Sequence, residues 1–152
     1  MRLAGTFRYD APPETAYALF TDPDALTNAM IGLRSLQELE PDRWAAEMKV
    51  GLGNFAVRYR GTISVTERTP EGYRLLIAAE TDGGSAEADV RLRFVPQDGG
   101  TRVEYDAKFA FAGAQRLIPA LARGLVDFFM HGMKDYLEKS GRRRGPGGLA
   151  GR

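Results

Sequence analysis

The chain has 152 residues, of which 43% are hydrophobic and 27% charged, and its formal net charge is +1. This profile is typical of one soluble globular domain, and the absence of cysteine excludes disulfides, thiolate metal sites and cysteine nucleophiles. No apolar run is long enough to cross a bilayer and the first residues lack the apolar core of a signal peptide, so we expect a cytoplasmic protein.

The first predicted elements are one strand and two short helices. Residues 3–9 alternate apolar and polar side chains, which is the period of a strand with one buried face. Pro13 is suited to a first helical turn, so we expect a short helix that ends near Phe20. Thr21 or Asp22 can cap a second short helix.

A meander of strands follows. We predict strands over residues 33–39, 44–50, 55–65, 73–79, 86–94 and 103–111, separated by turn residues. Gly61 interrupts an inward row, which indicates a bend, a bulge or a close approach of the backbone. Consecutive strands that are polar on one face predict an antiparallel sheet with its other face covered.

The outward rows of the later strands mix acids and bases. Glu87, Asp89, Glu104 and Asp106 alternate there with arginines and a lysine. On a solvated face, cross-strand ion pairs are the expected role of such residues, rather than an acid and base pair for catalysis.

A long helix is predicted near the end of the chain, within residues 112–139. Apolar residues recur there at steps of three and four, as in Leu121, Leu125 and Phe128, and a second apolar row lies beside them. Such a wide stripe needs a large partner surface, which the sheet supplies. Pro119 has no amide donor, so the regular helix either begins at about that point or is kinked in its first turn.

Residues 140–152 are rich in glycine and arginine, and we expect them to form a disordered basic tail behind a domain of residues 1–139. Five of the 21 basic residues follow Glu138, so the preceding chain carries 16 basic against 20 acidic side chains. An acidic domain argues against nucleic acid as a partner. The arginine cluster of the tail is either simply solvated or makes a weak, salt-sensitive contact with anionic lipid. Its members are Arg142, Arg143 and Arg144.

This order of elements predicts an α+β fold in which a curved antiparallel sheet wraps around the long C-terminal helix. Several inward positions are small, among them Ala79, Ala86 and Ala88, so sheet and helix can leave an apolar cavity between them, the usual site for a small molecule. Tyr59 and Tyr105 are the most informative inward residues, since a buried phenol needs a partner and can meet a ligand carbonyl. The candidate ligand-binding residues are Phe20, Met30, Met48, Tyr59, Tyr73, Tyr105, Phe109, Leu121, Leu125, Phe128 and Phe129. Ordinary core packing is the alternative for each of them.

The sequence offers little for catalysis or metal binding. His131 is the only histidine, and neither a metal shell nor a catalytic triad can be assembled around it. Gly51, Leu52 and Gly53 partly match a dinucleotide-binding fingerprint but lie in a predicted hairpin with no helix after it, so we interpret them as turn residues. We therefore predict no catalytic residue and no metal site.

Together, these segments resemble the helix-grip fold of the START and Bet v 1 superfamily (SRPBCC) and, within it, the G-subunit family of carbon monoxide dehydrogenase. The resemblance runs from about Leu3 to Leu137 and depends on order and spacing. Ile31 stands where the family usually has proline, and Pro119 where a small residue is usual; the hydrophobic membrane-anchoring tail of longer relatives is missing from this sequence. The similar stretches are GTFRYDAPPETAYALF, DPDALTNAMIG, LQELEPDRWAAEMKVGLG, FAVRYRGTISVTE, GGSAEADVRLRF and DGGTRVEYDAKFAFAG.

The resemblance implies a bacterial, non-catalytic accessory protein that assists a molybdenum hydroxylase similar to carbon monoxide dehydrogenase, or its recruitment to the inner face of the cell membrane. It also implies that a quinone or a lipid binds in the cavity, with no covalent cofactor. Two alternatives stay open. One is an enzyme similar to polyketide cyclases or hydrolases that acts on a hydrophobic substrate in the same cavity, and the other is a scaffold with a filled core that assists assembly of its partner.

Overall fold

The computed structural model describes residues 1–29, 33–52, 55–81, 83–113 and 119–143. In this part of the chain, seven strands and three helices occur, with the two short helices directly after the first strand as predicted. The strands are β1 (Arg2–Tyr9), β2 (Leu33–Glu40), β3 (Arg43–Leu52), β4 (Phe55–Thr69), β5 (Gly72–Thr81), β6 (Gly84–Gln97) and β7 (Gly100–Gly113). The helices are α1 (Pro13–Leu19), α2 (Pro23–Ala29) and α3 (Pro119–Arg143).

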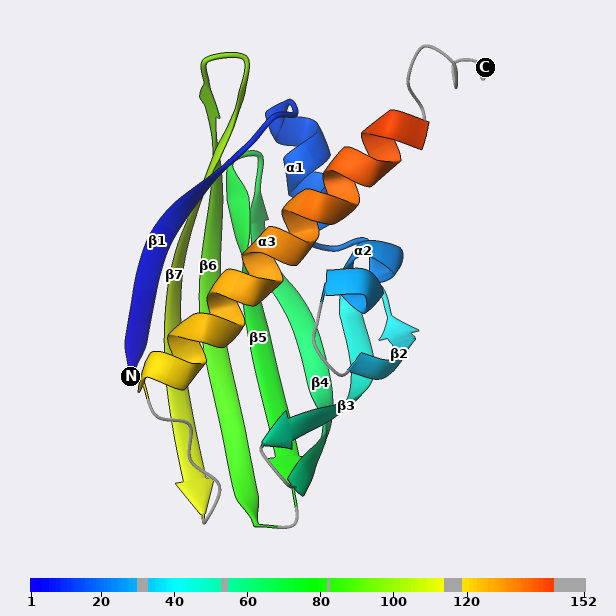
Figure 1. The fold of residues 1–152 in the computed structure, drawn as a ribbon, viewed down its shortest axis with the longest axis vertical. Coiled ribbons are helices and arrows are strands. Elements are labelled where there is room, and N and C mark those ends of the chain that lie inside the picture. Colours follow the sequence, from blue (N-terminus) through cyan, green and yellow to red (C-terminus); the bar gives the residue numbers. More distant parts are fainter. Residues whose placement is uncertain (30–32, 53–54, 82, 114–118, 144–152) are drawn as a thin grey trace.

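All seven strands form one antiparallel sheet with the order β1-β7-β6-β5-β4-β3-β2. From β2 to β7 each strand pairs with the next, and β1 pairs with β7 at the other edge. Figure 1 shows the sheet curving around α3, which crosses one face diagonally, with α1 and α2 on the same face. The predicted curved antiparallel sheet around a C-terminal helix is therefore confirmed.

Local sequence sets the ends of the two short helices. α1 begins at Pro13, whose fixed φ and missing amide donor suit the first turn. α2 begins at Pro23, and the Asp22 carboxylate accepts a hydrogen bond from the amide of Asp24 at 3.0 Å. Asp22 is therefore the capping residue, since the Thr21 hydroxyl donates to a carbonyl of the preceding turn instead.

Two backbone features shape β4. The strand approaches β5 so closely at Gly61 that a Cβ there would overlap the carbonyl oxygen of Ala78. Of the bend, bulge or close backbone approach predicted at Gly61, the structure therefore has the close approach. Near the end of β4 the register against β5 shifts, and Glu67 has a φ of 50°. A bulge of this kind redirects side chains, and the following residue, Arg68, contacts α1.

The long helix α3 begins at Pro119 and ends at Arg143. Its start agrees with a proline in the first turn, but the helix continues beyond Lys139, where we predicted its end. Residues 144–152 lie outside the described residues, so the disordered tail stays a prediction for them. β7 reaches Gly113, so the first part of the predicted helical segment is strand. Within the described ranges, no helix combines the length and the apolar character that crossing a membrane requires.

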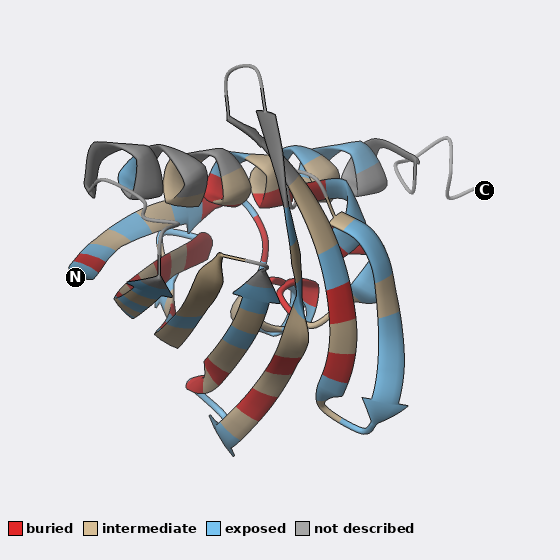
Figure 2. Cartoon of the chain, turned by 90° about the horizontal axis from the view of Figure 1, so that it is seen from below, coloured by how far each residue is buried: buried red, intermediate tan, exposed pale blue. Residues whose placement is uncertain are grey.

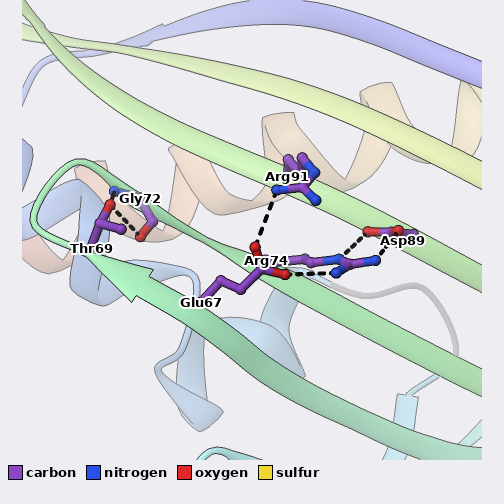
Figure 3. Close-up of polar contacts among 6 residues, drawn as sticks. All are labelled: Glu67, Thr69, Gly72, Arg74, Asp89 and Arg91. Atoms are coloured by element: carbon purple, nitrogen blue, oxygen red, sulfur yellow. Dashed lines mark hydrogen bonds and ion pairs between the residues drawn. The ribbon is translucent and has the colours of Figure 1, made fainter.

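The outward face of the sheet carries a network of ion pairs, part of which is drawn in Figure 3. The Arg74 guanidinium donates to both carboxylate oxygens of Asp89, at 2.8 and 2.6 Å, and to Glu67 at 2.6 Å, while Arg91 lies 3.5 Å from Glu67. Further pairs join Arg2 to Asp106, and Arg93 and Arg102 to Glu104. The predicted ion pairing is therefore confirmed for Asp89, Glu104 and Asp106. The pairs of Arg2 and Arg91 lie at exposed positions and contribute little to stability, whereas the Arg74–Asp89 pair is part-buried.

Candidate functional site

The inward-facing side chains of β3 to β7 become more exposed along the sheet. At the end beside α1 they are buried, with Phe94 3% and Val103 0% exposed. Away from α1, the inward positions whose burial is described are mostly apolar and only half-buried. Figure 2 shows this change from red to tan bands along the strands. We call the half-buried set the open inner surface; its members are Met48, Tyr59, Ile77, Ala79, Ala86, Ala88, Val90, Phe109 and Phe111.

The end of the sheet beside α1, which we call the closed end, is filled by aromatic rings. The Phe20 ring lies 5.9 Å from that of Tyr9, 5.7 Å from that of Phe94 and 6.0 Å from that of Phe129 on α3. Ring pairs at such distances add to the stabilisation from apolar burial. Tyr17 on α1 and Tyr73 on β5 complete the closed end with an edge-on contact at 4.8 Å.

Two tyrosine hydroxyls at the closed end have backbone partners. The Tyr9 hydroxyl donates to the carbonyl of Met130 at 2.9 Å, and the Tyr73 hydroxyl donates to the carbonyl of Tyr17 at 2.7 Å. A buried phenol without such a partner is costly, so these bonds let polar rings occupy the core. The closed end is therefore a satisfied, packed core.

An ion pair borders the closed end on its solvent side. The Arg68 guanidinium donates two hydrogen bonds of 2.7 Å to the Asp42 carboxylate and lies 5.8 Å from the ring centre of Tyr17 and 5.1 Å from that of Tyr73. No pattern in the sequence predicts this contact, because it depends on the bulge next to Arg68. Hydrogen bonding by Arg68 lowers the pKa of Asp42, and its positive charge adds to that effect.

Replacing Asp42 by asparagine should make the stability of the protein less dependent on pH. Asparagine tolerates the φ of 64° at this position but cannot carry the charge. Because folding lowers the Asp42 pKa, the pair stabilises the protein above the unfolded pKa of about 3.9, and this contribution is lost as pH falls through the folded pKa. Arg68 and Asp42 side chains are 34% and 39% exposed, so we expect at most about 1 kcal/mol.

Urea unfolding of the unmodified protein and of Asp42→Asn, from about pH 7 down to about pH 2, measures how the stability of each depends on pH. Other paired carboxylates also lose their charge on acidification, so the difference between the two proteins is the relevant quantity. A difference that persisted unchanged at the acid end would contradict an electrostatic role for Asp42.

Small residues contribute to the partial exposure of the open inner surface. In the sheet register, Ala88 lies opposite Ile77 on one side and Phe109 on the other, and Ala86 lies opposite Ala79 and Phe111. A methyl side chain extends only a short distance from the sheet, so Ala86 and Ala88 cover little of their larger neighbours. Because those neighbours are themselves half-buried, water reaches this surface.

Tyr105 lies within the buried part of β7, and the half-buried part of its inward row begins at Phe109. Its neighbours along the inward row of β7 are Val103, which is fully buried, and Ala107, which is 2% exposed. The Tyr105 ring stacks on Phe7 of β1 at 6.1 Å. Burial raises the pKa of Tyr105, and the nearby carboxylate of Asp127 on α3 adds to the rise.

The predicted ligand-binding residues fall into three groups. Met48, Tyr59 and Phe109 lie on the open inner surface, whereas Tyr105 lies among buried residues of β7. Phe20, Tyr73 and Phe129 belong to the closed end, where their rings pack against other aromatic rings. The third group is not described: Met30 lies outside the described residues, and so do the side chains of Leu121, Leu125 and Phe128 on α3.

The remaining candidates lie on α3 or beyond it. Arg142 and Arg143 form the end of the helix, with side chains outside the described ones, and Arg144 lies outside the described residues. His131 is exposed on α3, where its Nδ1 atom lies 2.8 Å from the carbonyl oxygen of Asp127 and its ring meets Phe7 edge-on at 5.3 Å. This placement fits a helix-surface residue.

Ile77, Val90 and Phe111 also lie on the open inner surface, although we did not predict them as ligand-binding residues. Their signal in the sequence is the same alternation that identifies the strands. What the alternation cannot show is how far along the strand the core extends.

A separate groove of about 470 Å³ lies on the outward face of the sheet. Its lining includes Arg74, Arg91, Arg93 and Glu104, together with the turn at Gly72. The cations there are already paired with carboxylates. The Thr69 hydroxyl holds the turn by donating to the Gly72 carbonyl and accepting from the Gly72 amide (Figure 3). Ligand pockets are mostly apolar, so the open inner surface is the better candidate.

Comparisons with known proteins agree with this fold. The family model for the G subunit of carbon monoxide dehydrogenase (CoxG) matches residues 5–138. No curated protein sequence matches the chain. Among solved structures, a conserved protein from Geobacillus kaustophilus has a TM-score of 0.83 at 23% identity, covering 92% of this chain and 97% of that one.

Two further solved structures share the fold. A START superfamily protein from Mycobacterium smegmatis has a TM-score of 0.71 at 13% identity, covering 91% of this chain and 97% of its own. The Zhui aromatase/cyclase from Streptomyces sp. R1128 has a TM-score of 0.63 at 10% identity, covering 95% and 94%. At these identities the similarity concerns the fold alone.

Proposed function

The chain belongs to the CoxG family, the G subunits of carbon monoxide dehydrogenase, and we propose that it is a non-catalytic accessory protein that holds an apolar ligand between its sheet and α3. The observation that carries this proposal is the change in burial along the strands. One end of the interior is packed, whereas the other exposes apolar side chains to water on the inside of the fold.

Exposed apolar surface inside a fold favours a ligand for a simple reason. Each area of about 100 Å² that a ligand removes from water contributes roughly 2.5 kcal/mol before the costs of binding are subtracted. The ligand would cover Ala88, Phe109 and Ile77 on the sheet side and meet α3 on the other. A quinone or a lipid has the apolar character that this surface requires.

The family suggests the partner and the place of action. We propose that the protein assists a molybdenum hydroxylase of the carbon monoxide dehydrogenase type, or its recruitment to the inner face of the cell membrane. Arg142, Arg143 and Arg144 would then contact anionic lipid, at about 1 kcal/mol for each basic group near the surface. Such a contact would be reversible and sensitive to salt.

The inward rows support binding better than catalysis. Among the described residues of β3 to β7, tyrosine is the only ionisable residue on these rows. Burial raises the pKa of Tyr73 and Tyr105 further above neutrality, so neither is suited to take up a proton at neutral pH. The cyclase or hydrolase alternative would need such a group next to the substrate.

Native mass spectrometry of the protein purified from its own cells tests the proposal. We expect a mass excess that organic extraction removes, and identification of the extract as an apolar molecule. The emptied protein should then take up a short-chain ubiquinone or lipid from phosphatidylglycerol vesicles. A protein that is empty in its cells and binds neither would contradict the proposal.

A further inference from the structure

Two strands of the sheet continue beyond it as a two-stranded ribbon. β3 and β4 remain paired as far as Leu52 opposite Phe55. Within the described part of the chain, the pairing of β2 with β3 stops at Met48, and that of β4 with β5 stops at Arg60. The residues beyond both points pair only with each other, and we call them the hairpin arm. It consists of residues 49–52 and 55–58.

Two cations face each other at the base of the hairpin arm. Lys49 and Arg58 lie opposite each other in the register, on the outward side, since they alternate with the inward-facing Met48 and Tyr59. In the described part of the chain, neither of them forms an ion pair. Like charges at directly opposite positions of a strand pair are destabilising. The arm therefore keeps two positive charges together at a cost in stability.

The neighbouring strands add further cations at this place. Arg34 on β2, next to the residue opposite Met48, and Arg60 on β4 form no ion pair with the described carboxylates. Glu47 and Glu80 lie opposite Arg60 in the register, so four cations stand against two described carboxylates. Elsewhere in the sheet, the described arginines of the strands all form ion pairs; they are Arg2, Arg8, Arg43, Arg68, Arg74, Arg91, Arg93 and Arg102.

The sequence of the arm favours a membrane surface as the partner of these cations. From Lys49 to Arg58 it reads KVGLGNFAVR, with large apolar residues at positions 50, 52, 55 and 57 and with no acid. Cations combined with apolar residues are typical of segments that lie at the interface of an anionic bilayer. A nucleic acid needs a broad cationic face instead, which this acidic domain does not offer.

The arm also lies beside the surface on which we place the ligand. Met48 and Tyr59, the inward neighbours of the two cations, belong to the open inner surface. A bilayer that touches the arm is therefore next to that surface. β3 ends in the lower half of Figure 1 and α3 ends near the top, so the arm and the C-terminal end of α3 lie far apart on the molecule.

We propose that the hairpin arm docks the protein on an anionic lipid membrane, with Lys49 and Arg58 beside the lipid phosphate groups. This inference rests on the proposed function, because that function brings the protein to a membrane, but it assigns the contact to a different surface from the C-terminal arginines. The contact is electrostatic and is weakened by salt. An apolar ligand then passes between the bilayer and the open inner surface without crossing bulk water.

Co-sedimentation with vesicles tests this assignment. The unmodified protein should bind vesicles made of phosphatidylglycerol and phosphatidylcholine in equal parts, and it should not bind vesicles of phosphatidylcholine alone. We expect Lys49→Gln combined with Arg58→Gln to lower the partition coefficient roughly 30-fold, the effect of removing two basic groups from an anionic surface. Lys49→Arg combined with Arg58→Lys keeps both charges and should bind like the unmodified protein.

Two controls separate a local effect from a general one. Arg93→Gln combined with Lys108→Gln removes the same charge from exposed outward positions of β6 and β7, and binding should stay nearly unchanged. Urea unfolding should show that Lys49→Gln combined with Arg58→Gln is at least as stable as the unmodified protein, because two like charges no longer face each other. Loss of vesicle binding by that variant then does not come from misfolding.

The remaining outcomes contradict the proposal in distinguishable ways. Equal vesicle binding by the unmodified protein and the variant without the two arm charges would overturn the role of the arm. If only replacement of Arg142, Arg143 and Arg144 by glutamine abolished binding, the membrane contact of the proposed function would stand without the arm. Loss of affinity for a purified molybdenum hydroxylase, but not for vesicles, would assign the arm to an acidic protein surface instead. If the unmodified protein ignored anionic vesicles, both membrane contacts would fall, whereas native mass spectrometry decides separately on the ligand.

Discussion

Replacing Ala88 by tryptophan is expected to abolish binding of apolar ligands, with a loss of at least about 100-fold in affinity for 2-ethylnaphthalene and little change in the free energy of unfolding. Ala88 faces inward on β6, between Ile77 and Phe109 in the register, and all three are half-buried. An indole ring at this position would occupy the space that we assign to the ligand. It would also cover apolar surface that water now reaches, which offsets any cost of crowding.

The matched control is Ala110→Trp. Ala110 is exposed and lies opposite Glu87 in the register of β6 and β7, so tryptophan there should leave binding unchanged. Calorimetric titration with 2-ethylnaphthalene measures the affinity, and urea unfolding measures the stability. If Ala88→Trp lost several kcal/mol of stability, the space next to Ala88 would already be filled by the protein, and the scaffold with a filled core would be the better interpretation.

Replacing Phe20 by alanine is expected to destabilise the protein by about 3–5 kcal/mol, the usual cost of removing a large aromatic side chain from a packed core. Phe20 is 1% exposed and contacts the rings of Tyr9, Phe94 and Phe129. A single domain is typically stable by only about 5–15 kcal/mol, so this loss is a large fraction of the total. Urea unfolding gives the value directly.

Leu39→Ala serves as the control for Phe20→Ala. Leu39 is 52% exposed on the edge strand β2, so its truncation should change stability by less than about 0.5 kcal/mol. The experiment also decides between the two interpretations of Phe20 that the sequence left open. If Phe20→Ala cost little stability but altered ligand affinity, Phe20 would line the ligand site instead of the closed end.

Phe20→Ala and Ala88→Trp test two parts of the interior, the closed end and the open inner surface, to which we assign different roles. The closed end supplies packing and satisfied hydrogen bonds, whereas the open inner surface combines small side chains with apolar ones that are only half-buried. Phe20→Ala should therefore affect mainly stability, and Ala88→Trp mainly binding. A protein that binds an apolar ligand needs both, because surface left open for a ligand contributes nothing to folding until the ligand covers it.

Alternation of apolar and polar residues was enough to predict the strands, the inward rows and the covering helix. Period two and period 3.6 are local properties of the backbone, so Val103, Tyr105 and Phe109 could be assigned to one face of a strand from the sequence alone. The outward ion pairs of Asp89 and Asp106 followed from the same pattern.

Only the tertiary structure decided which inward residues form a core and which stay open. Tyr73 and Tyr105 occupy equivalent positions in the pattern, yet one donates to the carbonyl of Tyr17 and the other has no acceptor in the described chain. Arg68 reaches two aromatic rings because of a bulge that the local sequence does not indicate. The physical reason is that burial depends on where α1 and α3 come to lie over the sheet, and that placement is set by contacts between residues far apart in the chain.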